Sequence, residues 1–292
     1  MKRTFTISLA LIGASLIATP LVSADHKQDD TPNSESMATF ILKGLSDREQ
    51  TAYKRYEKAL APEDIRAIEA ELQSIVDGYE KLVNAAPDYV PAYIAYGMLL
   101  HRVGEHIASN AMLIHADALD PMHAIVKNQL GNYQAEEGKY AQALAFYQMA
   151  IDLKPDEPLY HYQVGNLLFA WKRFFIDDKL FLPDGFDLQM QESFRAAAML
   201  NPTHLPYRLR YAQSFFDVSR PNWEAAIEEW QQLADFPGDP TQQQLMELYM
   251  ARARFGAGHH TAARKIIKRI DRPELQESKE KLLKMINAKH PR

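Results

Sequence analysis

Cysteine is absent from all 292 residues of the chain. Its absence excludes disulfides, thiolate nucleophiles, thiolate metal ligands and a lipid-accepting thiol behind an export signal. An excess of positive charge is lacking too, since 33 Lys and Arg residues face 38 Asp and Glu residues. The resulting net charge of −5 argues against general nucleic-acid binding. The hydrophobic content of 47% is nevertheless ordinary for a folded protein with a sizeable core.

The motifs of common enzymes are missing as well. The sequence contains no glycine-rich phosphate loop, no nucleophile elbow and no acid–base pair tied to a site. Glu192-Ser193-Phe194 resembles the start of a lytic transglycosylase motif, but the downstream Gly-Leu-Met-Gln element of that motif is absent. We therefore expect no enzymatic activity, no catalytic residue and no cofactor.

Histidine is concentrated in one stretch, which raises the question of a metal site. The stretch contains His101, His106, His115 and His123. None of their spacings is the i, i+4 pair that sets two ligands on one helix face, and no cysteine can complete a ligand set. We therefore expect hydrogen-bonded or solvated histidines and no metal site, and we expect the same of His259 and His260.

A long apolar run occurs only at the N-terminus. In residues 1–24, Lys2 and Arg3 precede the run, and the small residues of Val22-Ser23-Ala24 follow it where a signal peptidase would cut. An uncleaved membrane anchor is the alternative, but polar residues and a proline interrupt the run, and a spanning helix needs about 20 predominantly apolar residues. This pattern predicts export to the periplasm or beyond the cell.

The segment after the predicted signal is rich in turn-forming residues and lacks apolar periodicity. We expect a flexible leader over residues 25–45. Ser46 and Glu49 have the spacing of a capping box, which predicts a helix start at residue 46. Beyond this point apolar residues recur at helical spacing, and no alternating strand pattern competes with them.

Proline and glycine recur in this helical region with a period of thirty-four residues. The recurring positions are Pro87, Pro121 and Pro155; Gly97, Gly131 and Gly165; and Gly104 and Gly138. A fixed period of this length indicates a repeat architecture.

The best copy of the repeat, residues 124–157, resembles a tetratricopeptide repeat. The matching residues are Leu130, Gly131, Gly138, Tyr140, Ala143, Tyr147, Ala150 and Pro155. The resemblance implies an all-α, right-handed superhelical solenoid of antiparallel helix pairs. Such a pair cannot bury its apolar face alone, so neighbouring pairs must stack.

The resemblance also sets the expected domain organisation. Residues 90–123 are a second clear copy, and the solenoid is expected over residues 46–272. A capping helix with a basic tail is expected over residues 273–292. Residues 260–292 hold ten basic and four acidic residues. They could bind anionic lipid, polysaccharide or another copy of the chain, but such residues more often keep the end of a solenoid soluble.

One repeat is too long. Counted from residue 158, its closing proline, Pro202, arrives thirteen residues late, which places an insertion at about residues 172–188 between the two helices of the repeat. The insertion contains Phe174, Phe175, Phe181 and Phe186. These rings either pack back onto the solenoid as a flap, or cover the groove and dock a partner.

The resemblance implies that the first helix of each repeat lines a concave binding face. Its inner positions are Asn128, Gln129, Asn132, Glu136, Tyr162, Gln163, Asn166, Phe169, Arg210, Gln213, Phe216 and Asp217. Rows of amides with aromatic neighbours suit an extended peptide backbone or sugar hydroxyls, and a solvated surface without function is the alternative. The carboxylate clamp of some tetratricopeptide domains is not expected, because Asn128 and Pro206 stand where its two lysines belong.

Together these patterns predict a non-enzymatic scaffold of the cell envelope that binds a protein or peptide partner on the concave face of a solenoid. A module that binds glycan, either murein or another polysaccharide, is the alternative. No nucleic-acid partner is expected, and no membrane span once the signal is removed.

Overall fold

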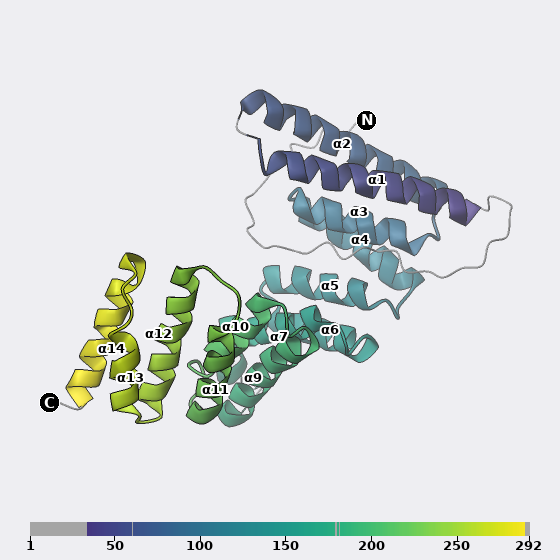
Figure 1. Cartoon of the computed structure of the whole chain (residues 1–292). Coiled ribbons are helices and arrows are strands. Elements are labelled where there is room, and N and C mark those ends of the chain that lie inside the picture. The colour runs from purple at the N-terminus through teal and green to yellow at the C-terminus, as the bar shows by residue number, and fades with distance from the viewer. Residues whose placement is uncertain (1–33, 60, 179, 181, 290–292) are drawn as a thin grey trace. The chain divides into compact units, whose positions relative to one another are not determined.

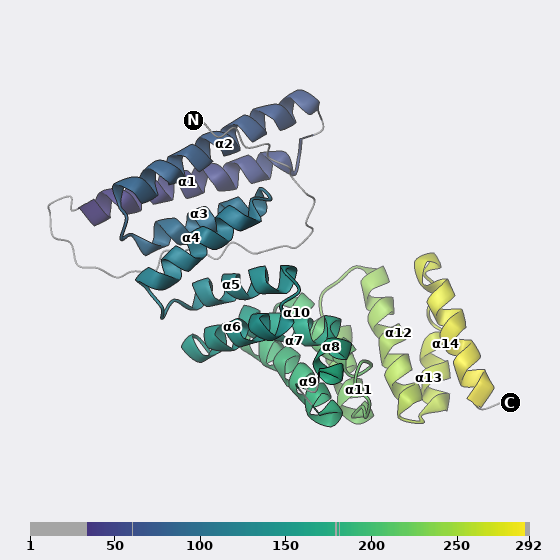
Figure 2. The ribbon, with the colours of Figure 1, turned by 180° about the vertical axis from the view of Figure 1, so that it is seen from behind.

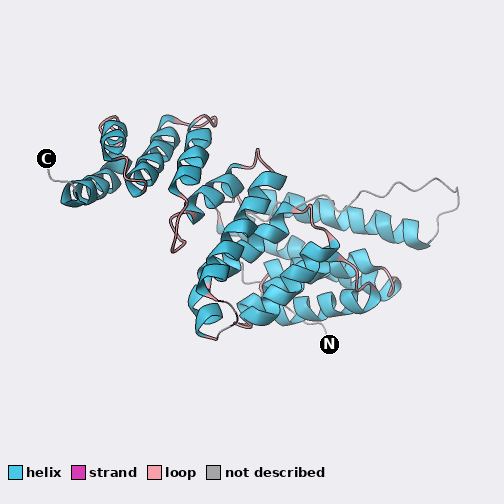
Figure 3. Cartoon of the chain, turned by 90° about the horizontal axis from the view of Figure 1, so that it is seen from below, coloured by secondary structure: helices cyan, strands magenta, loops and turns pink. Residues whose placement is uncertain are grey.

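The computed structural model describes residues 34–59, 61–178, 180 and 182–289. Over these residues the regular structure is helical, without a strand, as Figure 3 shows. The predicted signal peptide, residues 1–24, lies outside the described residues. Among the described helices, none combines the length and the apolar character that a membrane crossing requires.

The chain divides into two compact units, the first ending at Leu153 and the second beginning at Lys154. The helices of the first unit are α1 (Ser34–Tyr56), α2 (Pro62–Ala85), α3 (Val90–Arg102), α4 (His106–Leu119), α5 (Ala124–Glu136) and α6 (Tyr140–Leu153) (Figure 1). Successive helices pack as the pairs α1 with α2, α3 with α4 and α5 with α6. This is the arrangement of antiparallel helix pairs that the sequence predicted.

The second unit continues the pattern with one irregular repeat. Its helices are α7 (Pro158–Ala170), α8 (Lys172–Asp177), α9 (Pro183–Leu200), α10 (Leu205–Ser214), α11 (Trp223–Ala234), α12 (Pro240–Gly256), α13 (His260–Ile267), η1 (Pro273–Leu275) and α14 (Gln276–Lys289). Helix α7 pairs with α9, with the short α8 beside both (Figure 2). Helices α12, α13 and α14 lie side by side at the C-terminal end of the unit (Figure 1).

The prediction of a flexible leader up to residue 45 is wrong over its last part. Helix α1 begins at Ser34 and is 23 residues long, so the capping-box spacing at Ser46 does not mark a helix start. Ala38, Leu45 and Ala52 are seven residues apart, which places them on one face of the helix, and all three are buried. Burial of this face against the neighbouring helices stabilises the turns of helix that local composition did not predict.

The recurring prolines and glycines have the structural roles that their period suggested. Pro121 and Pro155 follow the ends of α4 and α6, where a proline cannot continue a helix. Gly104 and Gly138 lie between the two helices of a pair with φ of 87° and 73°, in the left-handed region that favours glycine. Each of these glycines therefore reverses the chain within its repeat.

A second set of glycines lets the paired helices approach closely. A Cβ atom at Gly131 would lie 2.6 Å from the Tyr147 ring, and one at Gly165 would lie 2.6 Å from the Phe194 ring. Both distances are far shorter than a van der Waals contact, so only glycine fits against these rings. The aromatic residue of the second helix thus fills the space that the glycine of the first helix leaves open.

The insertion forms helix α8 and the first turns of α9. Phe175 and Phe186 are fully buried, with ring centroids 6.2 Å apart. Asp187 pairs with Lys172 and accepts a hydrogen bond from the backbone N–H of Ser219 at 2.7 Å. Although burial alone would raise it, these hydrogen bonds hold the pKa of Asp187 below its ordinary value. The insertion is therefore a packed flap fixed to the loop after α10.

Candidate functional site

A cleft of about 300 Å³ opens in the second unit. Its walls come from α7, α10 with the turn that follows it, and α12, which are the first helices of three successive repeats. The lining residues are Phe169, Arg210, Gln213, Phe216, Asp217, Tyr249 and Arg252. We call this site the two-arginine cleft.

Arg210 lies between two aromatic rings. Its guanidinium carbon is 4.1 Å from the ring centroids of both Phe169 and Phe194, and its Nη1 is 2.9 Å from the Oδ2 of Asp217. Its Nη2 is buried without a hydrogen-bond partner among the described residues. The two ring contacts and the ion pair with Asp217 hold the guanidinium group in place at the wall of the cleft.

The opposite side of the cleft is built by a stack of rings under the second arginine. Trp230 and Tyr249 are stacked at 4.6 Å, and Phe216 lies 6.0 Å from Tyr249. The Arg252 guanidinium carbon sits 4.2 Å from the Phe216 ring centroid, and Arg252 forms no ion pair with any described residue. Arg252 is exposed, so its charge is available to a ligand in the cleft.

The charges and surfaces of the cleft define the chemistry that it can recognise. Two guanidinium groups face one carboxylate, that of Asp217, which leaves a positive balance beside apolar rings. Guanidinium groups bind carboxylates in a planar, two-point geometry, and rings supply apolar contact. The arrangement suits a ligand that combines an anionic group with an apolar side chain.

The structure brings together five of the residues predicted for the concave face. The five that line the two-arginine cleft are Phe169, Arg210, Gln213, Phe216 and Asp217. Tyr162 does not, because its ring packs between Tyr207, at 4.9 Å, and Phe194, at 6.0 Å. Gln163 and Asn166 are half-buried on α7 and do not line the cleft either.

The predicted residues of the first unit are buried or engaged within the fold. Asn128 is only 1% exposed and Gln129 is buried, so the prediction that both contact a ligand on an open face is wrong. Asn132 donates to Gln129 and accepts a hydrogen bond from the Tyr147 hydroxyl at 2.8 Å. Gln129 and Asn132 thus satisfy polar groups of their own repeat, a role that the repeat pattern alone does not distinguish from binding.

One of the two predictions for the insertion was that its four phenylalanines dock a partner. That prediction is wrong for two of the four. Phe175 and Phe186 are fully buried and cannot meet a partner. Phe174 is half-buried with its ring 5.3 Å from that of Phe175, and Phe181 lies outside the described residues. The rings bury each other, because an apolar insertion of this length forms a small core of its own.

Two lining residues, Tyr249 and Arg252, were missing from the predicted strip. Their positions relative to Met250 and Ala251 match those of Arg210 and Gln213 relative to Tyr211 and Ala212. The signal was therefore present in the sequence, and it required carrying the inner positions one repeat further.

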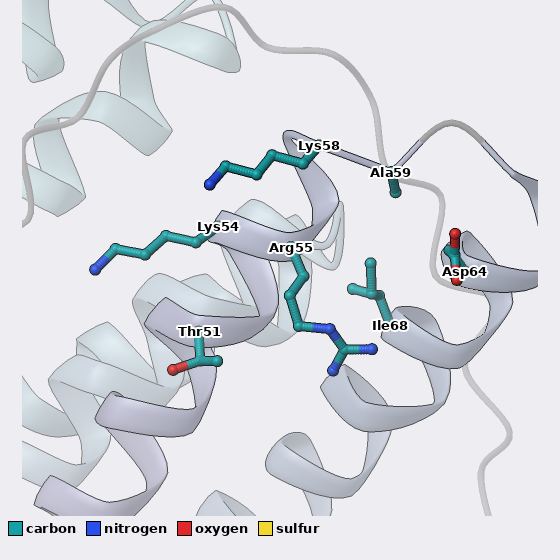
Figure 4. Close-up of a pocket in the computed structure, with 7 residues that line it drawn as sticks. All are labelled: Thr51, Lys54, Arg55, Lys58, Ala59, Asp64 and Ile68. Carbon is teal, nitrogen blue, oxygen red and sulfur yellow. The ribbon is translucent and has the colours of Figure 1, made fainter.

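A second hollow, of about 320 Å³, lies between α1 and the start of α2 in the first unit (Figure 4). Lys54, Arg55 and Lys58 contribute positive charge, and Ile68 forms part of the floor. Arg55 already pairs with Glu71 at 2.7 Å, while Lys54 and Lys58 are exposed. With its arginine engaged and its lysines in solvent, this hollow offers a ligand less than the two-arginine cleft does.

Comparison with known proteins agrees with the repeat geometry. The family model described as TPR repeat matches residues 131–170, from Gly131 in α5 to the end of α7. The chain carries tetratricopeptide repeats. No curated protein matches it.

Solved structures show the same tetratricopeptide fold at low sequence identity. YrrB, a TPR protein with an unusual peptide-binding site, is 14% identical with a TM-score of 0.53, covering 66% of this chain and 90% of YrrB. PilF of Pseudomonas aeruginosa is 15% identical with a TM-score of 0.54, covering 82% of this chain and 93% of PilF. At these identities the likeness establishes the fold alone.

Proposed function

We propose that this protein is a non-enzymatic tetratricopeptide-repeat scaffold that binds a peptide segment of a partner protein in the two-arginine cleft. The observation that carries the proposal is the convergence of Arg210 and Arg252 with three aromatic side chains on one cleft. The bound segment carries a carboxylate for the guanidinium groups and an apolar side chain for the rings. The peptide-binding site of YrrB, on the same fold, supports a peptide as the ligand.

The residues that line the two-arginine cleft support binding rather than catalysis. The only carboxylate, that of Asp217, is paired with Arg210, and no nucleophile lies beside a general base in the cleft. A glycan ligand is less favoured, because that alternative relied on an open strip of amides and two of them, Asn128 and Gln129, are buried.

The proposed scaffold is also an exported protein. The charged start, apolar run and small residues of positions 1–24 favour signal-directed export and a partner in the cell envelope. Determination of the N-terminal sequence of the protein isolated from its own cells tests this step. A chain that begins at Asp25 supports export with cleavage, and a chain that begins at residue 1 or 2 in the cytoplasm contradicts it.

Binding is tested by cross-linking to an envelope extract, followed by mass spectrometry and sugar analysis. Segments of the recovered protein are then titrated as synthetic peptides against the wild type, Arg252→Ala and Lys265→Ala. Lys265 is an exposed basic residue on α13 outside the cleft, so its substitution makes the same charge change without touching the site.

We expect Arg252→Ala to weaken peptide binding by about tenfold, or roughly 1.4 kcal/mol, and Lys265→Ala to leave it unchanged. Neutralising the carboxylate of the peptide should have an effect similar to that of Arg252→Ala. Equal affinities of all three proteins would place the peptide elsewhere, and recovery of sugar in place of protein would favour the glycan alternative.

A further inference from the structure

Three polar side chains from three helices meet at one end of the first unit. His101 is the second-last residue of α3, His106 is the first residue of α4, and Glu136 is the last residue of α5. The left-handed turn at Gly104 returns the chain from α3 to α4 and so brings the two histidines together. Helix α5 belongs to the next repeat, so the cluster joins residues 90–123 to residues 124–157.

The distances within this cluster are nearly equal. His106 Nδ1 is 3.3 Å from His101 Nδ1 and 3.3 Å from Glu136 Oε2, and His101 Nε2 is 3.3 Å from Glu136 Oε1. One ligand atom from each side chain lies within 4.8 Å of the other two. The two imidazole rings are almost perpendicular, with an interplanar angle of 80°.

Hydrogen bonds alone satisfy the polar atoms of these three side chains poorly. A distance of 3.3 Å exceeds the usual range for N–H···O bonds, which ends at about 3.2 Å. If His106 Nδ1 carries a proton, that proton is shared between His101 Nδ1 and Glu136 Oε2, and if it carries none, its lone pair faces the carboxylate oxygen. The three distances of 3.3 Å involve both ring nitrogens of His101 and both oxygens of Glu136, whereas one ligand atom from each side chain lies within 4.8 Å of the other two. A cation accepts lone pairs from all three side chains at once and can draw these atoms to the spacing of about 3.3 Å that neighbouring ligands of a tetrahedral zinc ion have when each bond is about 2.0–2.1 Å.

We propose that His101, His106 and Glu136 bind one divalent transition-metal ion of the zinc class. Two imidazoles and a carboxylate are ligands that Zn²⁺ accepts, and three protein ligands leave a further position for water or for a group of a partner. All three side chains are partly exposed, so an ion has access to them from solvent. The bound ion fastens the end of α5 to the α3–α4 turn and so links two neighbouring repeats.

This site is independent of the two-arginine cleft, because its residues belong to the first unit alone. The test titrates ZnCl₂ into untagged, chelator-treated protein at neutral pH by calorimetry. A second titration with Co²⁺ follows visible absorbance, which reports tetrahedral coordination. The variants are His101→Gln with His106→Gln, and Glu136→Gln alone. The matched control is His115→Gln with His259→Gln, which removes two exposed histidines elsewhere.

We expect one zinc ion per wild-type chain, and the same result for the control variant. The double variant at His101 and His106 should bind about 100-fold more weakly, and Glu136→Gln about tenfold more weakly. Zinc should raise the Tm of the wild type and of the control but not that of the double variant. Mg²⁺ should give no heat, because it prefers oxygen ligands in octahedral geometry.

Two results would overturn the proposal. One is a wild type that takes up no zinc, and the other is a double variant that binds zinc as tightly as the wild type. Far-ultraviolet circular dichroism of each variant keeps these results interpretable, since an unchanged helical signal shows that the fold is intact.

Discussion

Arg102 in the first unit and Arg210 in the second hold similar sets of contacts in different settings. Arg102 pairs with Glu49 at 2.9 Å and lies 5.2 Å from the Tyr53 ring. Arg210 pairs with Asp217 at 2.9 Å and lies between two phenylalanine rings. Each arginine thus combines an aromatic face with a carboxylate.

The carboxylates account for the difference between the two. Glu49 is only 4% exposed and also accepts a hydrogen bond from Tyr79, so its charge is enclosed by the fold. Asp217 borders the two-arginine cleft, where water reaches it. An arginine whose partner is enclosed holds helices together, whereas an arginine whose partner borders a cleft can exchange part of its contacts for a ligand.

The largest effect should come from removing the enclosed arginine. We expect Arg102→Ala to lower the free energy of unfolding by about 3 kcal/mol, because it leaves the Glu49 carboxylate buried without its cation. Urea denaturation measures this loss. Adding Glu49→Gln to the variant should restore part of the lost stability. A loss below about 1 kcal/mol in the single variant would show that water reaches Glu49, and the contrast between Glu49 and Asp217 would then fail.

The glycines at the close contacts should show that the two units use the same packing device. We expect Gly131→Ala and Gly165→Ala each to cost about 2 kcal/mol, since the new methyl group would lie 2.6 Å from an aromatic ring. Gly97→Ala should cost less, because its Cβ would lie 3.1 Å from Leu113, whose side chain is smaller and more adaptable. Denaturant titration of the three variants tests this order, and equal costs would contradict it.

The sequence predicted the helix pairs because their determinants are local and periodic. Gly104 and Gly138 are needed for a positive φ, and Gly131 and Gly165 for a ring on the next helix, so each leaves a mark at a fixed spacing. The early start of α1 left no such mark. Its buried face, which includes Ala38 and Leu45, is stabilised by tertiary packing, which the spacing of the repeat does not report.

The candidate sites were only partly predictable, because they depend on how repeats stack. Phe169 and Arg210 occupy the inner positions that the resemblance implied, and they do meet in one cleft. Asn128 occupies such a position too, yet it is buried. His101 and His106 lacked the spacing of two ligands on one helix, and they come together because a tight turn joins two helices and Glu136 approaches from a third. Spacing rules for a single helix do not detect such a cluster.

The pH dependence of stability should distinguish the enclosed carboxylate of Glu49 from a carboxylate that water reaches. Burial raises the pKa of Glu49 above its ordinary 4.5, although Arg102 and Tyr79 oppose the shift. The folded state therefore favours the protonated carboxyl more than the unfolded state does. The contribution of this shift is present below pH 4.5 and is lost as the pH rises through the folded-state pKa.

Glu49→Gln does not titrate, so it isolates this contribution. The unfolding free energy of the wild type minus that of Glu49→Gln should decrease as the pH rises from 4.5 towards neutrality. Urea denaturation of both proteins across this range gives the difference directly. If this difference stayed constant or increased with pH, the effect of Arg102 on the pKa of Glu49 would be at least as large as the effect of burial.

The smallest effect on stability should come from the arginine at the open edge of the cleft. We expect Arg252→Ala to change the free energy of unfolding by less than about 1 kcal/mol, since the exposed guanidinium loses only its contact with the Phe216 ring. Denaturant titration checks this value beside that of Arg102→Ala. If Arg252→Ala proved as costly as Arg102→Ala, both arginines would be structural. A small loss of stability combined with weaker peptide binding would instead show that this arginine serves the ligand and contributes little to the fold.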